Sequence, residues 1–244
     1  MNKGELMKKL LIGMTVAALI SMTAVASDKA HWDYDKHGPA HWGDFSKTCK
    51  IGKAQSPINI VTSSKISLKA KYALLLDESR STTAKVYDNG HGIKVEPAAS
   101  GKIAIDGVEY KLLQFHFHGR SENTIDGHQF ALEAHMVHQN KEGQYAVVGI
   151  MFEEGKNNPL LDNILGNVGE NIRVNPNDLL PNHTHSYYHW EGSFTTPPCT
   201  EGVEWFLMKE VVTASKEQIA EFRKYYENNF RPVQPLNGRT IGSY

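Results

Sequence analysis

The stretch Gln114-Phe115-His116-Phe117-His118 decides the fold of this chain. Polar and aromatic residues alternate there at every position, and a β-strand points successive side chains to opposite faces. The pattern therefore predicts a strand that buries its two phenylalanines and presents Gln114, His116 and His118 together on the other face. Two imidazoles project into the same space.

A second stretch supplies a third imidazole. In residues 133–137, which read Glu-Ala-His-Met-Val, the same alternation puts Glu133, His135 and Val137 on one face. The turn pair Asp126-Gly127 lies between the two stretches and favours a hairpin-like return. We therefore expect the two strands to lie side by side.

The three imidazoles of His116, His118 and His135 predict a zinc site. Three neutral imidazoles on a rigid sheet suit Zn2+, and they leave the fourth tetrahedral position to water, which is typical of a catalytic site. A lone His-x-His pair would mean little in a chain with 12 histidines. Gln114 and Glu133 strengthen the prediction, because each lies two residues from a ligand on the same face, where it can accept the other ring N–H.

Short apolar segments recur between turn signals along the rest of the chain. They predict strands at residues 84–87, 93–96, 102–105, 108–117, 130–138, 145–152 and 203–207, and helical spacing predicts helices at 158–169 and 216–226. Residues 27–53 carry aromatic side chains without periodicity, which predicts an irregular arm packed onto the body. The fold class is therefore mainly β (α+β), with a large, mostly antiparallel central sheet and short peripheral helices.

The first 26 residues have the order of a targeting segment. Three lysines precede an apolar run at residues 10–20, and small residues follow up to Ala24-Val25-Ala26. This order is typical of a cleaved signal peptide, so we expect a periplasmic or secreted protein without a membrane span after cleavage. The alternative is an uncleaved anchor, although the run is shorter than the roughly 20 residues that span a bilayer. Residues 27–244 show no repeat or linker, which predicts a single domain.

Export would also change the net charge of the chain and the expected redox state of its two cysteines. Removing residues 1–26 lowers the 26 basic residues to 23 and the 27 acidic residues to 26, which leaves a net charge of −3. That charge argues against a nucleic-acid partner. Cys49 and Cys199 would meet an oxidising compartment, where a pair of cysteines usually forms a disulfide. We expect them to be bonded, and two buried free thiols are the alternative.

Beyond these residues, the sequence resembles the α-carbonic anhydrases, especially their bacterial secreted members, over nearly the whole of residues 27–244. The motifs that carry the resemblance are Gly38-Pro39-Ala40-His41-Trp42, Gln55-Ser56-Pro57-Ile58-Asn59-Ile60, Asn89-Gly90-His91, residues 114–118, Ser121-Glu122, residues 133–138, Gly192-Ser193-Phe194-Thr195-Thr196-Pro197-Pro198-Cys199 and Gln234-Pro235-Leu236-Asn237-Gly238-Arg239. An ordered set of this size is very specific. It implies an enzyme that hydrates CO2 reversibly to bicarbonate and a proton.

The resemblance also implies roles for individual residues. Zinc-bound hydroxide would attack CO2, and carbonic anhydrases are themselves the type example of zinc lowering the pKa of bound water to ≈ 7. Thr195 would accept the hydroxide proton in a hydrogen bond and donate its own proton to Glu122, which aims the oxygen at the substrate. His91 stands where the family keeps its proton shuttle, and the ordinary histidine pKa of ≈ 6.5 suits transfer in both directions.

CO2 is apolar, so its pocket should be a small hydrophobic wall close to the metal. Val137 comes two residues after His135 on the same strand face, which directly supports its place in this wall. By resemblance, Val147, Phe194 and Trp205 join this wall, with plain core packing as the alternative. The hydroxyl groups of Thr195 and Thr196 would complete the substrate site.

Three positions depart from the common family pattern. Asn123 replaces a histidine that many relatives have after Ser-Glu, so the partner of Glu133 is expected to differ. Phe194 replaces a common leucine, and Lys94 stands where an asparagine often lines the polar wall. These departures bear on rate and not on the reaction.

Two rival interpretations stay open. One is a catalytically silent member of the fold that binds a partner or ligand, and it would require the loss of a zinc ligand. The other is a zinc hydrolase for esters or peptides, but no His-Glu-x-x-His motif occurs. A second His-x-His, His183-Thr184-His185, is expected in an exposed polar loop, with an accessory metal site as the alternative. A homodimer is left open, because no motif marks an interface.

Overall fold

The computed structural model describes residues 31–244 apart from 64–73, 78–80 and 100. The expected signal peptide at 1–26 and the first residues of the arm therefore lie outside the described residues. Within the described part of the chain, no helix is long and apolar enough to cross a membrane.

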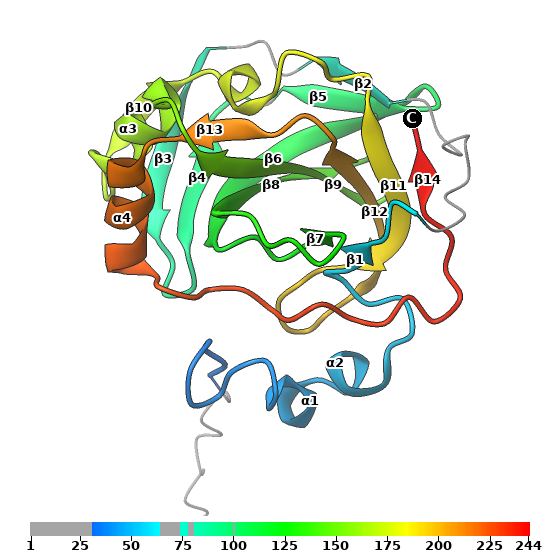
Figure 1. The fold of residues 1–244 in the computed structure, drawn as a ribbon. Coiled ribbons are helices and arrows are strands. Elements are labelled where there is room, and N and C mark those ends of the chain that lie inside the picture. Colours follow the sequence, from blue (N-terminus) through cyan, green and yellow to red (C-terminus); the bar gives the residue numbers. More distant parts are fainter. Residues whose placement is uncertain (1–30, 64–73, 78–80, 100) are drawn as a thin grey trace, which may run out of the picture. The chain divides into compact units, whose positions relative to one another are not determined.

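A large mixed sheet dominates the fold (Figure 1). In order across the sheet, its main strands are β10 (Asn171–Val174), β3 (Thr82–Asp88), β4 (Ile93–Pro97), β6 (Val108–Gly119), β8 (Leu132–Gln139), β9 (Tyr145–Glu154), β12 (Glu201–Met208), β11 (Tyr187–Ser193) and β14 (Gly242–Ser243). β5 (Lys102–Ile105) pairs with β6 and with β2 (Leu74–Asp77), and β13 (Val212–Ala214) pairs with β9. β1 (Asn59–Ile60) and β7 (Thr124–Ile125) form a separate parallel pair.

Most neighbouring strands in the large sheet run antiparallel, so the predicted fold class is confirmed. The exceptions all involve β9, which runs parallel to β12 on one side and to β13. All seven predicted strands are present, with boundaries that differ by a few residues. The turn between β6 and β8 also forms as expected, with Asp126 and Gly127 at φ angles of 49° and 80°, which is the left-handed region that a tight turn needs.

The helices are short and lie at the periphery. They are α1 (Trp42–Phe45), α2 (Lys47–Ile51), α3 (Pro159–Leu165), the 3-10 helix η1 (Pro176–Leu179) and α4 (Lys216–Tyr225). Local sequence explains α4, which begins with a capping box between Ser215 and Gln218. The prediction of a helix up to Gly169 was too long, because Gly166 already caps α3. The arm expected to be irregular at 27–53 contains two short helices, α1 and α2, among its described residues.

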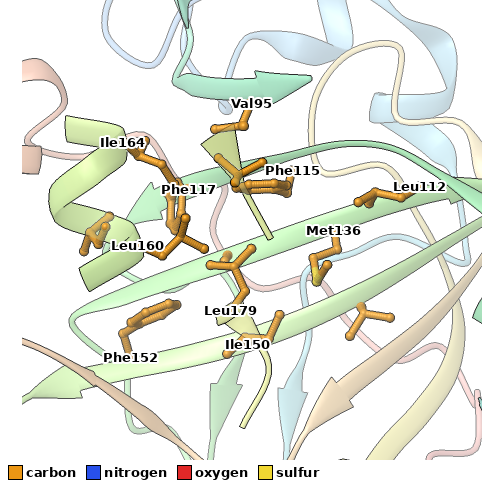
Figure 2. Close-up of a cluster of buried hydrophobic side chains, with 14 of the residues drawn as sticks. Val95, Leu112, Phe115, Phe117, Met136, Ile150, Phe152, Leu160, Ile164 and Leu179 are labelled. Atoms are coloured by element: carbon orange, nitrogen blue, oxygen red, sulfur yellow. The ribbon is translucent and has the colours of Figure 1, made fainter. Parts of the chain in front are cut away.

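The central strands pack one face against a hydrophobic core and present the predicted site residues on the other face. In β8, Leu132, Ala134 and Met136 are buried in the larger apolar cluster, whereas Glu133 and His135 point to the opposite face. Figure 2 shows that cluster, where strand residues meet α3. Its labelled members are Val95, Leu112, Phe115, Phe117, Met136, Ile150, Phe152, Leu160, Ile164 and Leu179. Burial of these side chains fixes which face the polar residues must take.

The arm at residues 31–53 is tied to the sheet, as its aromatic residues predicted. Trp42 is fully buried, and the guanidinium carbon of Arg231 lies 5.9 Å from the centre of its ring. The predicted disulfide between Cys49 and Cys199 is present and closes a sequence separation of 150 residues. The Ser46 hydroxyl adds a 2.8 Å hydrogen bond to the carbonyl of Pro198. The arm is therefore anchored beside the loop that carries Thr195 and Thr196.

Candidate metal centre

Three imidazoles converge on the open face of β6 and β8. His116 lies directly opposite His135 in the antiparallel register, and His118 follows two residues later in β6. The ring centroids are 5.3 Å apart for His116 and His135, and 4.5 Å apart for His118 and His135. One nitrogen from each ring can be chosen so that all three lie within 4.8 Å of one another. The structure thus brings the predicted ligand set together.

The remaining ring nitrogens have partners that fix how each imidazole is turned. His116 Nδ1 lies 2.9 Å from Oε1 of Gln114, and His118 Nδ1 lies 2.7 Å from the backbone carbonyl of Asn229. His135 Nε2 makes a 3.0 Å contact with Oε1 of Glu133, close enough for an ion pair although not aligned as a hydrogen bond. Gln114 and Glu133 therefore lie where the sequence placed them. Asn229 was missed, because a backbone carbonyl leaves no signature in the side-chain pattern.

The electrostatics of the cluster suit a cation. Burial lowers the pKa of all three histidines, and the neighbouring His118 lowers that of His116 and His135 further. The rings are therefore neutral at ordinary pH and able to donate lone pairs. The buried Nε2 of His118 has no hydrogen-bond partner, and an unpaired buried nitrogen is costly. The residues present therefore fit a metal ion.

Asn123 is a hydrogen-bond partner of Glu133. Its side-chain amide donates to Oε1 of Glu133 at 2.8 Å, while the backbone N–H groups of Glu122 and Asn123 each donate to Oε2 at 2.9 Å. Burial raises the pKa of Glu133 to about 7, although these hydrogen bonds act to lower it. On the other side, a Cβ at Gly149 would lie 3.1 Å from this carboxylate, so the glycine leaves room for it.

Glu122 lies between the histidines and the C-terminal segment. Its Oε1 accepts a 2.7 Å hydrogen bond from the backbone N–H of Arg231, and its Oε2 lies 3.4 Å from Nε2 of His118. Burial raises the pKa of Glu122 well above its ordinary value, and a hydrogen bond with the Thr195 side chain acts in the opposite direction. Thr195 is therefore near enough to affect Glu122, while donation from the Thr195 hydroxyl to this carboxylate stays a prediction. The backbone partner Arg231 was not foreseen.

A cavity of about 450 Å³ opens beside the three imidazoles. All the predicted substrate-site residues line this cavity. They are Val137, Val147, Phe194, Thr195, Thr196 and Trp205. The ring of Trp205 lies 4.9 Å from that of His135. Sequence reasoning missed Tyr145, whose ring packs edge-on against Phe194 at 4.9 Å. One wall of the cavity is therefore apolar and begins next to His135, one of the three predicted metal ligands.

A smaller cavity of about 160 Å³ connects His91 with the same imidazoles, because His91, His116 and His118 all line it. The ring of His91 stacks on Trp32 with centroids 3.6 Å apart and an interplanar angle of 11°. Burial lowers the pKa of His91, and nearby His31 lowers it further. Trp32 in the arm was not singled out, since an aperiodic segment gives no cue to where its aromatic rings lie.

The second His-x-His pair does not resemble this cluster. The side chain of His183 is 85% exposed and pairs with Glu210, its Nδ1 lying 2.6 Å from Oε2. Among the residues that the structure describes, only His116, His118 and His135 form a group of at least three side chains that could hold a metal. Nothing therefore supports an accessory site at His183 and His185.

Comparisons with known proteins agree with this geometry. The family model of the eukaryotic-type carbonic anhydrases matches residues 37–244. A carbonic anhydrase of Pectobacterium carotovorum is 42% identical and covers 93% of this chain and 98% of its own. The structure of the α-carbonic anhydrase from Thermovibrio ammonificans with the inhibitor sulfanilamide has a TM-score of 0.79 and 43% identity, covering 87% of this chain and 98% of its own. Dioscorin complexed with ascorbate also has a TM-score of 0.79, at 32% identity, covering 88% and 98%.

Proposed function

The chain belongs to the eukaryotic-type (α) carbonic anhydrase family, and from this premise we propose that it is a zinc enzyme that interconverts CO2 with bicarbonate and a proton. One observation carries the choice of zinc. Three neutral imidazoles, two of them buried and that of His116 half-buried, each offer a nitrogen to one point, and nitrogen ligands in this number suit a catalytic zinc ion. Zinc bound there would supply Lewis-acid activation of water near neutral pH, the effect for which carbonic anhydrases are the type example.

Thr195 and Glu122 would orient the attacking oxygen. The Thr195 hydroxyl can accept one hydrogen bond and donate one. Donation of its proton to the Glu122 carboxylate would leave the hydroxyl oxygen to accept from the attacking group, and the influence of Thr195 on the pKa of Glu122 supports this pairing. Arg231 holds Glu122 in place through its backbone N–H. Fixing the orientation in advance lowers the entropic cost of attack.

The apolar wall would hold CO2. Val137, Val147 and Trp205 are at most 6% exposed and line the larger cavity next to His135. Because CO2 offers little for a polar group to bind, a hydrophobic surface beside the attacking oxygen is sufficient. Phe194 would close this wall, and the Thr196 hydroxyl would face the substrate from the other side.

His91 would carry the product proton away. It shares the smaller cavity with His116 and His118, and it makes no direct contact with the ligands, so transfer would pass through water. Burial lowers its pKa, which favours the neutral imidazole that can accept a proton.

The deciding experiment compares His135→Ala with His183→Ala. We expect His135→Ala to lose zinc in a metal determination and to lose CO2 hydration in a stopped-flow assay. His183→Ala removes a histidine from the exposed loop and should keep both. Equal zinc content in His135→Ala and the parent protein would refute the ligand assignment. A zinc-loaded parent that hydrates no CO2 would instead favour a silent binding protein of the same fold.

We also propose that the protein is periplasmic or secreted. The disulfide between Cys49 and Cys199 supports this proposal, since such bonds persist in oxidising compartments. Intact mass before and after export would test cleavage after Ala26. A cytoplasmic protein that retains residues 1–26 would contradict it.

A further inference from the structure

Lys94 occupies an unusual place beside the candidate metal centre. It lies directly opposite His116 in the antiparallel register of β4 and β6. Its side chain lines both the larger and the smaller cavity. It therefore places a formal positive charge at the junction of the two cavities.

Two neighbours hold the Lys94 side chain against the polar wall. Its Nζ lies 2.8 Å from Oε1 of Glu96, and the Tyr87 hydroxyl donates a 2.7 Å hydrogen bond to the same oxygen. Nζ also lies 5.8 Å from the centre of the Tyr87 ring, within reach of a cation–π contact. Burial acts to lower the pKa of Lys94, but Glu96 and Tyr87 outweigh it and raise that pKa. The ammonium is therefore charged and held in position.

This ammonium keeps capacity for a further partner. A lysine ammonium has three N–H donors and no acceptor. Glu96 and Tyr87 surround one side of it, and the Lys94 side chain remains 25% exposed. Apart from histidines, Lys94 is the only basic residue that lines either cavity in the described part of the chain. Glu96 is the only carboxylate that lines the larger one.

We propose that Lys94 is a binding element for carboxylate groups inside this cavity, and that Glu96 competes for the same ammonium. The inference rests on the proposed function, because it concerns ligands of the same site. It deepens that function by naming a ligand class: small monovalent carboxylates, bicarbonate among them, and larger ligands that carry a carboxylate. Lys94 is then a specificity-determining residue that retains anionic ligands beside His116.

The test compares two ligands that differ in charge and little in shape. The probes are 4-carboxybenzenesulfonamide and 4-carbamoylbenzenesulfonamide, since a relative was solved with an arylsulfonamide. Calorimetry on the zinc-loaded protein gives a dissociation constant for each. The measured quantity is the preference for the carboxylate, defined as the dissociation constant of the carboxamide divided by that of the carboxylate.

Opposite effects are expected from the two charged partners. Lys94→Gln should lower the preference about three- to fivefold, the size of a partly exposed ion pair. Glu96→Gln removes the competitor and should raise the preference by about the same factor. Binding of the uncharged carboxamide reports in each variant whether the cavity is intact. Raising the salt concentration should reduce the preference of the parent protein.

Lys85→Gln is the matched control. Lys85 also approaches the Tyr87 ring, with Nζ 4.8 Å from its centre, but it lines neither cavity. The preference of the Lys85→Gln variant for the carboxylate ligand should equal that of the parent protein. The proposal is overturned if Lys94→Gln keeps the parental preference, if Glu96→Gln lowers it, or if Lys85→Gln lowers it as much as Lys94→Gln does. A folded, zinc-loaded parent that binds neither sulfonamide would overturn the proposed function, and this inference with it.

Discussion

The side-chain amide of Asn123 donates a 2.8 Å hydrogen bond to Glu133, the carboxylate that contacts His135. The same amide uses its oxygen to accept the backbone N–H of Ile58 at 2.9 Å. Asn123 is fully buried, so neither bond competes with water. The neutral side chain of Asn123 thus links Glu133, beside His135, to the backbone just before β1.

Replacing Asn123 should weaken zinc binding. In Asn123→Ala, Glu133 loses a donor and Ile58 loses an acceptor, so the carboxylate no longer holds His135 as firmly. We expect about a tenfold loss of zinc affinity, at the lower end of what such supporting residues contribute. Competition with a chelator measures it.

Asn140 offers the matched control for this experiment. It is also buried and fully engaged, with its amide donating to Gln144 at 2.7 Å, but it lies in the turn between β8 and β9. Asn140→Ala should lower the free energy of unfolding while leaving zinc affinity at the parental value. If both alanine variants bind zinc equally well, the outer hydrogen bond of Glu133 has no part in metal retention.

Removing the proposed shuttle should slow turnover in weak buffer. His91→Ala leaves the ligands and the apolar wall intact but deprives the smaller cavity of the imidazole that is not a proposed zinc ligand. We expect CO2 hydration to fall about tenfold or more, within the contribution of a positioned proton carrier, and added imidazole to restore part of it. His128→Ala, which removes an exposed histidine paired with Glu153, should have no effect. An unchanged rate for His91→Ala would exclude this residue.

The stack with Trp32 should control the pKa of His91. Burial lowers that pKa below its ordinary value of 6.5, so Trp32→Ala should raise it toward 6.5, as followed by NMR titration. The unfolded chain binds a proton at His91 more readily than the folded protein, so this residue makes the fold less stable as pH falls through 6.5. Trp32→Ala should reduce that loss. Trp32→Phe keeps an aromatic surface and should keep the lowered pKa; equal values in all three proteins would contradict the role of the stack.

The disulfide should contribute a large part of the stability. Cys49→Ser combined with Cys199→Ser opens a loop with a sequence separation of 150 residues. The chain-entropy account then predicts a free energy of unfolding lower by up to about 5 kcal/mol. Denaturant titration of the parent and the double variant measures the difference. Coincident unfolding curves would show that the bond adds nothing to stability.

Alternation explains how much of the site could be predicted from the sequence. A period of two over residues 114–118 and 133–137 fixes which side chains face the core, and the same parity assigns Gln114, His116 and Glu133 to the open face. In the structure β6 pairs with β8 in a register that sets His116 opposite His135. Parity and a local turn are enough to bring His116 and His135 together.

The parts that were missed depend on contacts between distant segments. Strands such as β11 and β14 pair far from one another in sequence, and β14 is only two residues long, too short for any period to show. Likewise, α1 and α2 have four and five residues, fewer than helical spacing requires. Asn229 and Arg231 act through backbone groups, whose hydrogen bonds the side-chain pattern does not encode.

The two opposite faces of β6 and β8 also limit how this protein can change its length. A single residue added within either strand would exchange the parity of everything beyond it, turning phenylalanines toward the polar site and imidazoles into the larger apolar core. Both packing and chemistry would fail at once. Insertions and deletions in this lineage should therefore gather in the hairpin around Asp126-Gly127 and avoid the strands themselves.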